Sequence, residues 1–330
     1  MTDILIFEDS YERIREELAN RDVRVICWHG DGRMSLDGAT VSTSQIAPQV
    51  GWISFDVFTA KKMAPYAEAL ASFDTMQWVQ SAMAGLDTPP YQTLAKKGVR
   101  LSKSWAQSIP IAEYVLAHAL SHFQDLPARA AAQVAHEWRY LPFRELYAKR
   151  WLIIGFGHIG RRVAMRARAF ECHVTALRSS LTPDPAANAQ ITRAELLDTL
   201  SQVDVVVLAC PQTPETTGMV NADFIGSMKP GALLVNVARG GLIDDEALLE
   251  GLAAGRPGAA VLDVFHEEPL PASSAYWSHD KVTVTAHMSN AGEGTQARGC
   301  EQFLQNLDAY LAREQPTDEV SPASLLANKA

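Results

Sequence analysis

The sequence predicts an α/β protein in which a doubly wound parallel-sheet domain is inserted into a smaller α/β domain. Two series of short apolar runs alternate with helical stretches, and this alternation is typical of parallel strands joined by right-handed crossovers. The glycine-rich segment Gly155–Gly160 directly follows the first run of the second series. A chain of 330 residues is also long enough for two domains of ordinary size.

The first series predicts a small α/β unit over about the first hundred residues. A helical pattern covers Tyr11–Asn20, with Ile14 and Leu18 on one face. Five apolar or β-branched runs are expected to be strands: Ile4–Phe7, Val23–Trp28, Trp52–Phe55, Met76–Gln80 and Val99–Ser102.

The second series predicts a sheet whose two faces are both covered by helices, because its strands are almost continuously apolar. Thr192 and Glu195 form a capping box that is expected to open a helix. Another helix is expected over Asp245–Ala254, where Gly255 would end it. The six expected strands are Trp151–Ile154, His173–Leu177, Asp204–Ala209, Leu233–Val237, Ala259–Val264 and Lys281–Thr285.

Two long helical stretches, Ile109–Phe123 and Thr295–Arg313, flank the second series. A chain that leaves the first domain through one helix and returns through the other makes the second domain an insertion. We therefore expect a discontinuous domain of residues 1–103 and 288–330 around an inserted domain of residues 104–287.

Composition excludes several classes of protein. The 29 Lys and Arg residues stand against 38 Asp and Glu, and a net charge of −9 argues against binding to nucleic acid or to an anionic membrane. No apolar run is long enough to span a bilayer, and the acidic start does not resemble a signal peptide. The four cysteines are far apart, so we expect reduced thiols, no metal site and a cytoplasmic protein.

The segment Gly155-Phe156-Gly157-His158-Ile159-Gly160 fits the GxGxxG pattern of dinucleotide-binding domains. It lies between an expected strand and an expected helix, which is the context that the pattern requires. The first glycine would allow a tight turn, the second a close approach of the pyrophosphate, and the third close packing of helix and strand. The pyrophosphate would then lie at the helix N-terminus.

The end of the second strand indicates which cofactor is preferred. Domains that bind NAD usually carry Asp or Glu there, on the ribose hydroxyls. This chain has Arg178, Ser179 and Ser180 instead, which can pair with or donate to a 2′-phosphate. We therefore expect NADP(H) to be preferred, with NAD(H) possible. The alternative for Arg178 is a solvated loop charge.

Three charged or titratable residues follow the last three strands and are expected to converge at one edge of the sheet. They are Arg239, Glu268 and His287. Ligands of doubly wound sheets bind beyond the carboxyl ends of the strands. The three side chains would supply a cation for a substrate carboxylate, an imidazole for proton transfer, and a carboxylate that keeps the imidazole protonated.

The ordered set of motifs resembles the D-isomer-specific 2-hydroxyacid dehydrogenases, and within them most closely the glyoxylate and hydroxypyruvate reductases. The resemblance runs from about Trp78 to Leu311 and depends on Gly155–Gly160, Pro211–Thr216, Lys229–Gly231, Asn236–Gly240, Asp263–Pro269 and His287. It implies a Rossmann domain inserted into a smaller flavodoxin-like substrate domain. It also implies a homodimer that acts on a 2-oxo or 2-hydroxy acid.

The resemblance also implies roles for individual residues. Arg239, Glu268 and His287 match the catalytic trio, and the N–H groups of Ala84 and Gly85 would bind the substrate carboxylate together with Arg239. Asp263 matches the residue that contacts the nicotinamide amide. Beyond the glycine motif and Arg178–Ser180, the implied cofactor contacts are Cys210, Pro211, Thr216, Val237, Ala238, Arg239, Asp263 and His287.

Two features stand apart from these roles. Met288-Ser289-Asn290 departs from the family pattern, in which Ile and small residues are more usual after the catalytic histidine. Trp138 resembles a tryptophan on the dimerisation arm of hydroxypyruvate reductases, which reaches toward the partner's active site. The alternative for Trp138 is burial in a dimer interface without contact to substrate.

Two other functions remain open for this sequence. One is a dinucleotide-sensing interaction protein, similar to the corepressors built on the same fold, although the intact trio favours an enzyme. The other keeps the chemistry but changes the substrate to formate, phosphite or a larger 2-oxo acid.

Overall fold

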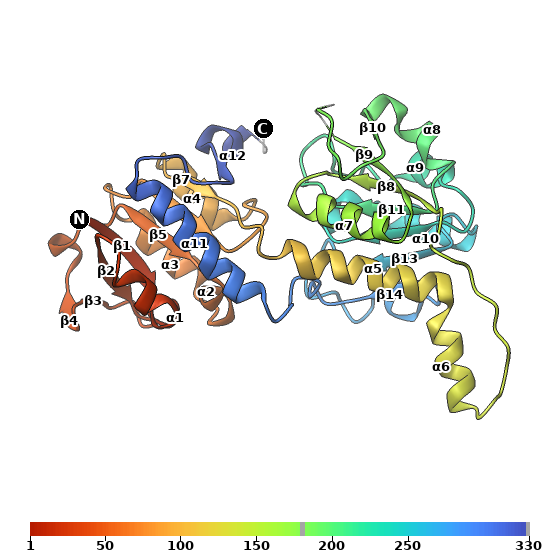
Figure 1. Ribbon diagram of the computed structural model, residues 1–330, viewed down its shortest axis with the longest axis horizontal. Helices are drawn as coiled ribbons and strands as arrows, with labels where there is room; N and C mark the ends of the chain where they lie inside the picture. Colours follow the sequence, from red (N-terminus) through yellow and green to blue (C-terminus); the bar gives the residue numbers. More distant parts are fainter. Residues whose placement is uncertain (179–181, 328–330) are drawn as a thin grey trace. The chain divides into compact units, whose positions relative to one another are not determined.

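The computed structural model describes residues 1–178 and 182–327. The chain forms two compact units (Figure 1). Unit 1 contains Met1–Gln107 and the chain from Glu293 onward, and unit 2 is the continuous segment Ser108–Gly292. The chain therefore crosses between units after residues 107 and 292, whereas the sequence placed these crossings after residues 103 and 287.

Unit 1 contains an eight-stranded sheet in the order β15-β7-β6-β5-β1-β2-β3-β4. Its five central strands are parallel, and β3, β4 and β15 are antiparallel edge additions. The strands are β1 Thr2–Phe7, β2 Val23–Trp28, β3 Met34–Leu36, β4 Ala39–Val41, β5 Val50–Ile53, β6 Trp78–Ser81, β7 Arg100–Ser102 and β15 Glu319–Val320. The five predicted strands are present, but the run Trp52–Phe55 was wrong at its end, because Phe55 begins a helix.

Helices cover both faces of the unit 1 sheet. Because strand side chains alternate between faces, Ile4 and Ile6 pack toward Phe303 and Leu307, while Leu5 and Phe7 belong to the opposite core cluster. The helices are α1 Glu8–Leu18, α2 Phe55–Thr59, α3 Met63–Ala71, α4 Pro89–Lys96, α11 Thr295–Leu311 and α12 Pro322–Ala327. Residues near both ends of the chain thus share one core.

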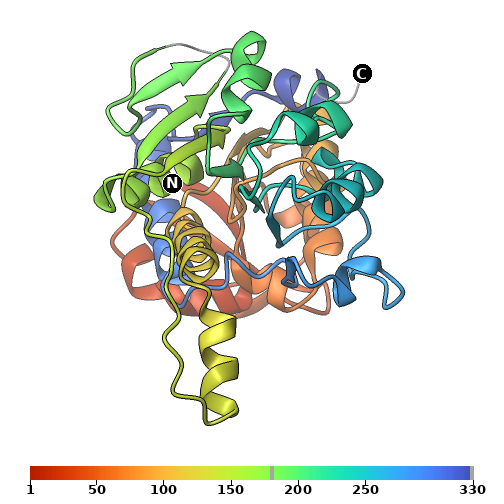
Figure 2. The ribbon, with the colours of Figure 1, turned by 90° about the vertical axis from the view of Figure 1, so that its right-hand side faces the viewer.

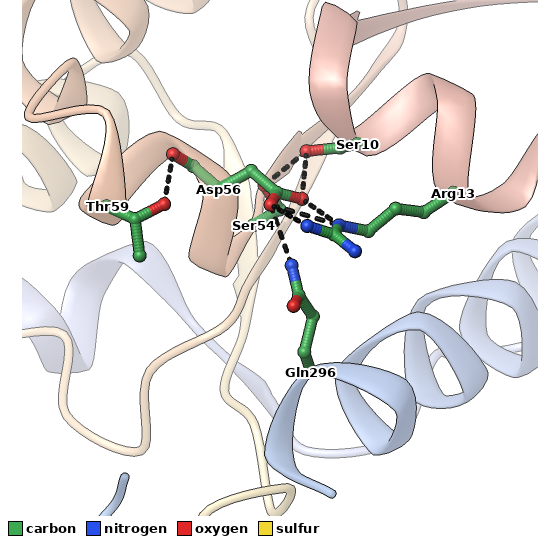
Figure 3. Close-up of polar contacts among 6 residues, drawn as sticks. All are labelled: Ser10, Arg13, Ser54, Asp56, Thr59 and Gln296. Atoms are coloured by element: carbon green, nitrogen blue, oxygen red, sulfur yellow. Dashed lines mark hydrogen bonds and ion pairs between the residues drawn. The ribbon is translucent and has the colours of Figure 1, made fainter. Parts of the chain in front are cut away.

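A buried carboxylate ties three of these helices together (Figure 3). Asp56 on α2 is 5% exposed and accepts hydrogen bonds from Arg13 Nε on α1 at 3.0 Å and Gln296 Nε2 on α11 at 2.7 Å. Ser10 Oγ donates to the same carboxylate at 3.2 Å and also contacts Ser54 Oγ. The carboxylate therefore fixes the start of α11 against α1 and α2.

Unit 2 contains a seven-stranded sheet in the order β10-β9-β8-β11-β12-β13-β14, and all of its ladders are parallel. The strands are β8 Arg150–Ile154, β9 His173–Leu177, β10 Ala189–Ile191, β11 Val205–Leu208, β12 Leu233–Asn236, β13 Ala259–Leu262 and β14 Val282–Val284. All six predicted strands are present, and β10 is an additional edge strand. This is the parallel α/β architecture that the sequence predicted.

The unit 2 sheet is buried on both faces, as its apolar strands predicted. Trp151 and Ile153 belong to the core cluster formed with α5 and α7, whereas Leu152 and Ile154 belong to the cluster formed with α8, α9 and α10. The helices are α5 Ser108–Gln124, α6 Leu126–Val134, α7 His158–Ala169, α8 Leu196–Leu200, α9 Ala222–Ser227 and α10 Asp245–Ala253.

Local signals act largely as the sequence indicated. The capping box of Thr192 and Glu195 is formed, although it opens a single 3₁₀ turn, Arg193–Glu195, that leads into α8. Gly255 follows α10 with a φ of +77°, which is the left-handed conformation that ends helices. Among the described residues, none of the helices has the length and apolarity that crossing a membrane requires.

Helix α6 and the chain after it project from unit 2, away from its sheet (Figure 2). We refer to residues 126–147 as the arm. Its aromatic side chains are exposed, and Trp138 is fully open to solvent with a relative exposure of 105%. The other exposed aromatic residues of the arm are Tyr140, Phe143 and Tyr147.

Candidate active site

The carboxyl edge of the unit 2 sheet has a switch point between β8 and β11, where the strand order changes direction. The glycine loop follows β8 at this point. Gly155 has a φ of +93°, and a Cβ placed there would lie 2.5 Å from the backbone of Ala209 and Cys210. A side chain at Gly155 would therefore push apart the loops that follow β8 and β11.

Gly157, the middle glycine of the loop, is exposed to solvent and does not pack against another segment of the described chain. Among the described residues, no heavy atom outside its chain neighbours lies within 4 Å of a Cβ placed there. Gly157 is also the N-cap of α7 and, as a glycine, has no side chain with which to cap that helix end. The N–H groups of the first turn of α7 thus suit a phosphate group, and the open backbone would let a pyrophosphate approach.

Arg178 follows β9 and lies beside a second arginine. Its Nη1 is 3.6 Å from Asp184 Oδ2, and Arg161 Nε donates to the same oxygen at 2.6 Å. Burial raises the pKa of Asp184, but the Ala186 amide and the two guanidinium groups outweigh it and lower that pKa overall. The cluster of two arginines and one carboxylate keeps a net positive charge, and the sequence analysis missed Asp184 as its centre.

Ser179 and Ser180, which the sequence analysis assigned to the cofactor, lie outside the described residues. Other predicted cofactor contacts follow β11 and β12 at the same edge. Pro211 O accepts a hydrogen bond from Thr216 Oγ1 at 2.9 Å, and burial raises the pKa of the Cys210 thiol to about 11. Val237 and Ala238 are each 7% exposed.

Glu268 and His287 are in direct contact. Glu268 follows β13, His287 follows β14, and the His287 Nδ1 is 2.8 Å from Glu268 Oε2. The other carboxylate oxygen of Glu268 accepts the Phe265 N–H at 2.9 Å. Both oxygens of Glu268 are therefore used, and the imidazole is held through Nδ1, so that Nε2 is the nitrogen available for a substrate.

Arg239 follows β12, the strand that neighbours β13. Its loop is held by the buried Asn236, whose Nδ2 donates to Arg239 O at 2.9 Å and whose Oδ1 accepts the Ala238 N–H at 3.0 Å. A Cβ at Gly240 would overlap the backbone of Phe265. The absence of a side chain at Gly240 thus lets the Arg239 loop pack directly on the loop that carries Glu268.

Asp263 lies beneath this site and is completely buried. Its Oδ1 accepts hydrogen bonds from Thr285 Oγ1 at 2.6 Å and from Met288 N at 2.9 Å, and its Oδ2 accepts Ser289 N at 3.0 Å. The contact of Asp263 with the nicotinamide amide, which the family resemblance implies, stays a prediction. Sequence reasoning missed Thr285 as a partner of Asp263.

Ala84 and Gly85 belong to unit 1, in the loop after β6. Ser81 Oγ accepts the Met83 N–H at 2.9 Å, and Met83 O accepts the Ser104 N–H at 2.8 Å. Leu86 is buried at the other end of the loop. The two residues are therefore presented by a loop that is fixed on both sides.

The fold and the glycine loop define a dinucleotide-binding protein of the doubly wound class. The profile described as "D-isomer specific 2-hydroxyacid dehydrogenase, NAD binding domain" matches residues 116–289, which is more than half of the chain. The chain therefore belongs to the D-isomer-specific 2-hydroxyacid dehydrogenase family, as its motifs predicted.

Individual relatives agree with this assignment. The D-3-phosphoglycerate dehydrogenase of Mycobacterium bovis is 32% identical over 266 residues, which cover 80% of this chain and 50% of that protein. The chain thus spans about half the length of the curated relatives of this kind that it matches.

Solved structures of the family share the fold. A family protein from Aeromonas salmonicida is 26% identical with a TM-score of 0.77, covering 97% of this chain and 99% of that one. A family member from Xanthobacter autotrophicus, solved in complex with NADPH, is 23% identical with a TM-score of 0.78, covering 98% of this chain and 100% of that one.

Proposed function

We propose that the protein uses NADPH to reduce a small 2-oxo acid of the glyoxylate or hydroxypyruvate type to the D-2-hydroxy acid. The observation that carries this proposal is the Glu268–His287 pair, in which a carboxylate holds one ring nitrogen and leaves the other for a substrate. The pair shares a sheet edge with Arg239 and the glycine loop. The bound nicotinamide would supply the hydride.

The residues of the site have distinct tasks in the proposed reaction. Protonated His287 donates a proton from Nε2 to the carbonyl oxygen of the 2-oxo acid, and Glu268 keeps the ring in the orientation that donation requires. Arg239 pairs with the substrate carboxylate and polarises the carbonyl group. The family resemblance also implies that the N–H groups of Ala84 and Gly85 bind a substrate carboxylate, and this role is part of the proposal. Water returns the proton to His287 after each turnover.

The role of His287 is tested by its replacement with alanine. A positioned general acid contributes about 10²- to 10⁴-fold, so His287→Ala is expected to lower kcat by about that factor. The dissociation constant of NADPH, measured by fluorescence titration, should change little. Wild-type turnover by this variant would remove His287 from the mechanism.

A panel of substrates tests the function as a whole. NADPH oxidation would be followed with glyoxylate, hydroxypyruvate, pyruvate, phenylpyruvate and 3-phosphohydroxypyruvate, and we expect the highest kcat/KM with glyoxylate or hydroxypyruvate. The alternative is a preference for 3-phosphohydroxypyruvate. The 32% identical relative is named a D-3-phosphoglycerate dehydrogenase, and reduction of 3-phosphohydroxypyruvate gives D-3-phosphoglycerate. No turnover with any member would favour a dinucleotide-sensing interaction protein.

The preference for NADPH is supported by Arg178 and Arg161. Both guanidinium groups flank one carboxylate, so the cluster keeps one net positive charge after the β9 strand. A 2′-phosphate can pair with such a cluster, whereas an acidic residue at the strand end would repel it. NADH lacks the 2′-phosphate but shares the pyrophosphate that the glycine loop would bind, so we expect it to bind more weakly than NADPH.

The proposed assembly is a homodimer formed through the arm. The support is the exposure of four aromatic side chains on one projecting segment, because large exposed apolar areas usually mark interaction sites. We propose that Trp138 packs on the second copy, where it would either line the partner's active site or fill the interface.

A further inference from the structure

The backbone of His287 has a conformation that L-amino acids rarely adopt. Its φ is +50°, in the left-handed region, although His287 is not a glycine. Such a conformation costs free energy and persists only where surrounding groups enforce it. The structure should therefore contain contacts that hold this residue in place.

Asp263 makes these contacts. Three consecutive backbone N–H groups donate to it: His287 N to the Asp263 backbone oxygen at 2.8 Å, Met288 N to Oδ1 at 2.9 Å, and Ser289 N to Oδ2 at 3.0 Å. One buried residue thus fixes the peptide groups on both sides of the His287 Cα. It thereby sets the direction in which the imidazole leaves the chain.

The orientation of Asp263 depends in turn on Thr285 and Tyr114. Thr285 Oγ1 donates to Asp263 Oδ1 at 2.6 Å. Thr285 has a single hydroxyl proton, so its second contact, 2.7 Å from Tyr114 Oη on α5, is a hydrogen bond that Tyr114 donates. The hydrogen bonds therefore run in one direction, from Tyr114 to Thr285 to Asp263.

The surroundings of Tyr114 suit a fixed donor. Burial raises the pKa of Tyr114 to about 12, so its hydroxyl keeps its proton at neutral pH. Its ring contacts His118 one turn later on α5, with ring centroids 4.3 Å apart. Burial lowers the pKa of His118 despite the attraction of Asp263, so the neighbour of Tyr114 is an uncharged ring.

We infer that Tyr114 is a positioning residue for His287 and acts through Thr285 and Asp263. It orients the Thr285 hydroxyl, which orients the buried carboxylate, which holds the strained backbone from which the imidazole extends. The inference rests on the proposed role of His287 as the proton donor. Tyr114 itself touches neither substrate nor cofactor in this scheme.

Tyr114→Phe removes only the terminal hydroxyl. With hydroxypyruvate and NADPH as probes, we expect kcat to fall about three- to tenfold, the effect of losing one hydrogen bond. The KM for hydroxypyruvate and the dissociation constant of NADPH should each change less than about twofold. Thr285→Val is expected to lower kcat further, and Thr285→Ser, which keeps the hydroxyl, should restore nearly wild-type turnover.

A matched control separates positioning from stability. Tyr66 in unit 1 also buries its hydroxyl, which donates to Leu5 O at 2.7 Å. Tyr66→Phe should lower the stability of the protein to urea but leave kcat unchanged. Equal losses of kcat in Tyr66→Phe and Tyr114→Phe would overturn the inference.

The decisive test combines Tyr114→Phe with His287→Ala. If Tyr114 acts through the imidazole, its replacement has no further effect on kcat once the imidazole is gone. The same fold loss in both backgrounds, or wild-type kcat in the single variant, would reject the positioning role while His287 keeps its own. Unchanged turnover in His287→Ala alone would reject the proposed proton donor, and the inference with it.

Discussion

The imidazole of His287 and the carboxylate of Glu268 form a pair in which each partner is constrained from a second side. Glu268 is fixed by the Phe265 N–H as well as by the ring, and His287 is fixed by its backbone contacts with Asp263. A residue at this site therefore has few alternative conformations. Substitutions that keep the size but change the hydrogen-bonding pattern are the sharpest probes of such a pair.

Glu268→Gln is one such substitution. His287 Nδ1 and the Phe265 N–H lie at different oxygens of Glu268, and a glutamine replaces one of these oxygens with a donating NH₂ group, so it cannot accept at both positions. Loss of a hydrogen bond to a charged group costs about 1.5–3 kcal/mol, and kcat is expected to fall by roughly 10- to 150-fold. Steady-state kinetics with hydroxypyruvate measure the effect.

The neighbouring Glu267 provides the control for this prediction. It is exposed on the same loop, and Glu267→Gln removes the same charge without touching the imidazole. Its kcat should equal that of the wild type. A similar loss in both variants would mean that net charge near the site, instead of the Glu268 contact, supports turnover.

Arg178→Ala tests the choice of cofactor at a single residue. A guanidinium that pairs with the 2′-phosphate contributes about 1.5–3 kcal/mol, so NADPH should bind about tenfold or more weakly while NADH is nearly unaffected. Isothermal titration with each cofactor provides the comparison. Arg166→Ala is the matched control, since Arg166 also lies near the glycine loop in sequence but pairs with Glu113.

Two results would contradict this prediction in different ways. Equal losses for NADPH and NADH would mean that Arg178 contacts the adenine or shapes its loop. A kcat/KM for NADH equal to or above that for NADPH in the wild-type protein would reject the preference altogether.

The sequence predicted the three residues of the candidate active site but not the contacts that support them. Arg239, Glu268 and His287 were assigned because residues after adjacent parallel strands share one edge, and the motif order supported this. The links from Asp263 to Thr285 and Tyr114 were not foreseen. They depend on the φ of His287 and on a contact between residues 171 positions apart, and neither leaves a local pattern in the sequence.

At the level of helices and strands, the eleven predicted strands are all present, and the strands that the sequence did not predict are β3, β4, β10 and β15. These four strands have two or three residues each and do not lie in a longer apolar run, unlike β7 and β14, which are equally short. They exist because a neighbouring strand offers free hydrogen-bonding groups, as β7 does for β15. The apolar run through Phe55 shows the opposite error, since hydrophobicity alone does not mark where a strand ends.

Asp56→Ala tests how helices of unit 1 are held together. The variant removes the acceptor shared by Arg13, Ser10 and Gln296, and hydrogen bonds to a charged group contribute about 1.5–3 kcal/mol. Amides at the start of α11 and in α1 should therefore exchange with deuterium roughly 10- to 150-fold faster.

Mass spectrometry of hydrogen exchange measures this effect peptide by peptide. Asp223→Ala, on an exposed first turn of α9 in unit 2, serves as the control and should leave α1 and α11 unchanged. Unaltered exchange of α1 and α11 in Asp56→Ala would show that apolar packing alone, as between Trp52 and Phe303, holds these helices.

At the scale of the whole molecule, the arm exposes aromatic side chains that nothing in a single chain covers among the described residues. Trp138→Ala is expected to weaken dimerisation by about 30-fold or more, since a buried tryptophan anchor contributes about 2 kcal/mol or more to an interface. The KM for hydroxypyruvate should rise if the side chain also lines the partner's site. Sedimentation velocity over a range of concentrations and steady-state kinetics measure the two effects.

Trp277 provides the control for the arm. It is also exposed, at 54%, but it lies outside the arm and its Nε1 donates to Pro271 O. Trp277→Ala should keep both the dimer and the kinetics of the wild type. A dimer with normal KM in Trp138→Ala would reject both proposed roles of Trp138.

The interrupted path of the chain through unit 1 has a consequence for biosynthesis. Phe303 and Leu307 complete a core that Ile4 and Trp52 begin, so unit 1 stays unfinished on the ribosome until all of unit 2 has been made. Closing a flexible loop as long as unit 2 costs roughly 4–5 kcal/mol of entropy. In folded unit 2 the two ends meet, because a Cβ at Gly292 would lie 2.6 Å from Pro110 Cβ. Because synthesis runs from the N-terminus to the C-terminus, we expect unit 2 to fold first and then to bring the two segments of unit 1 together.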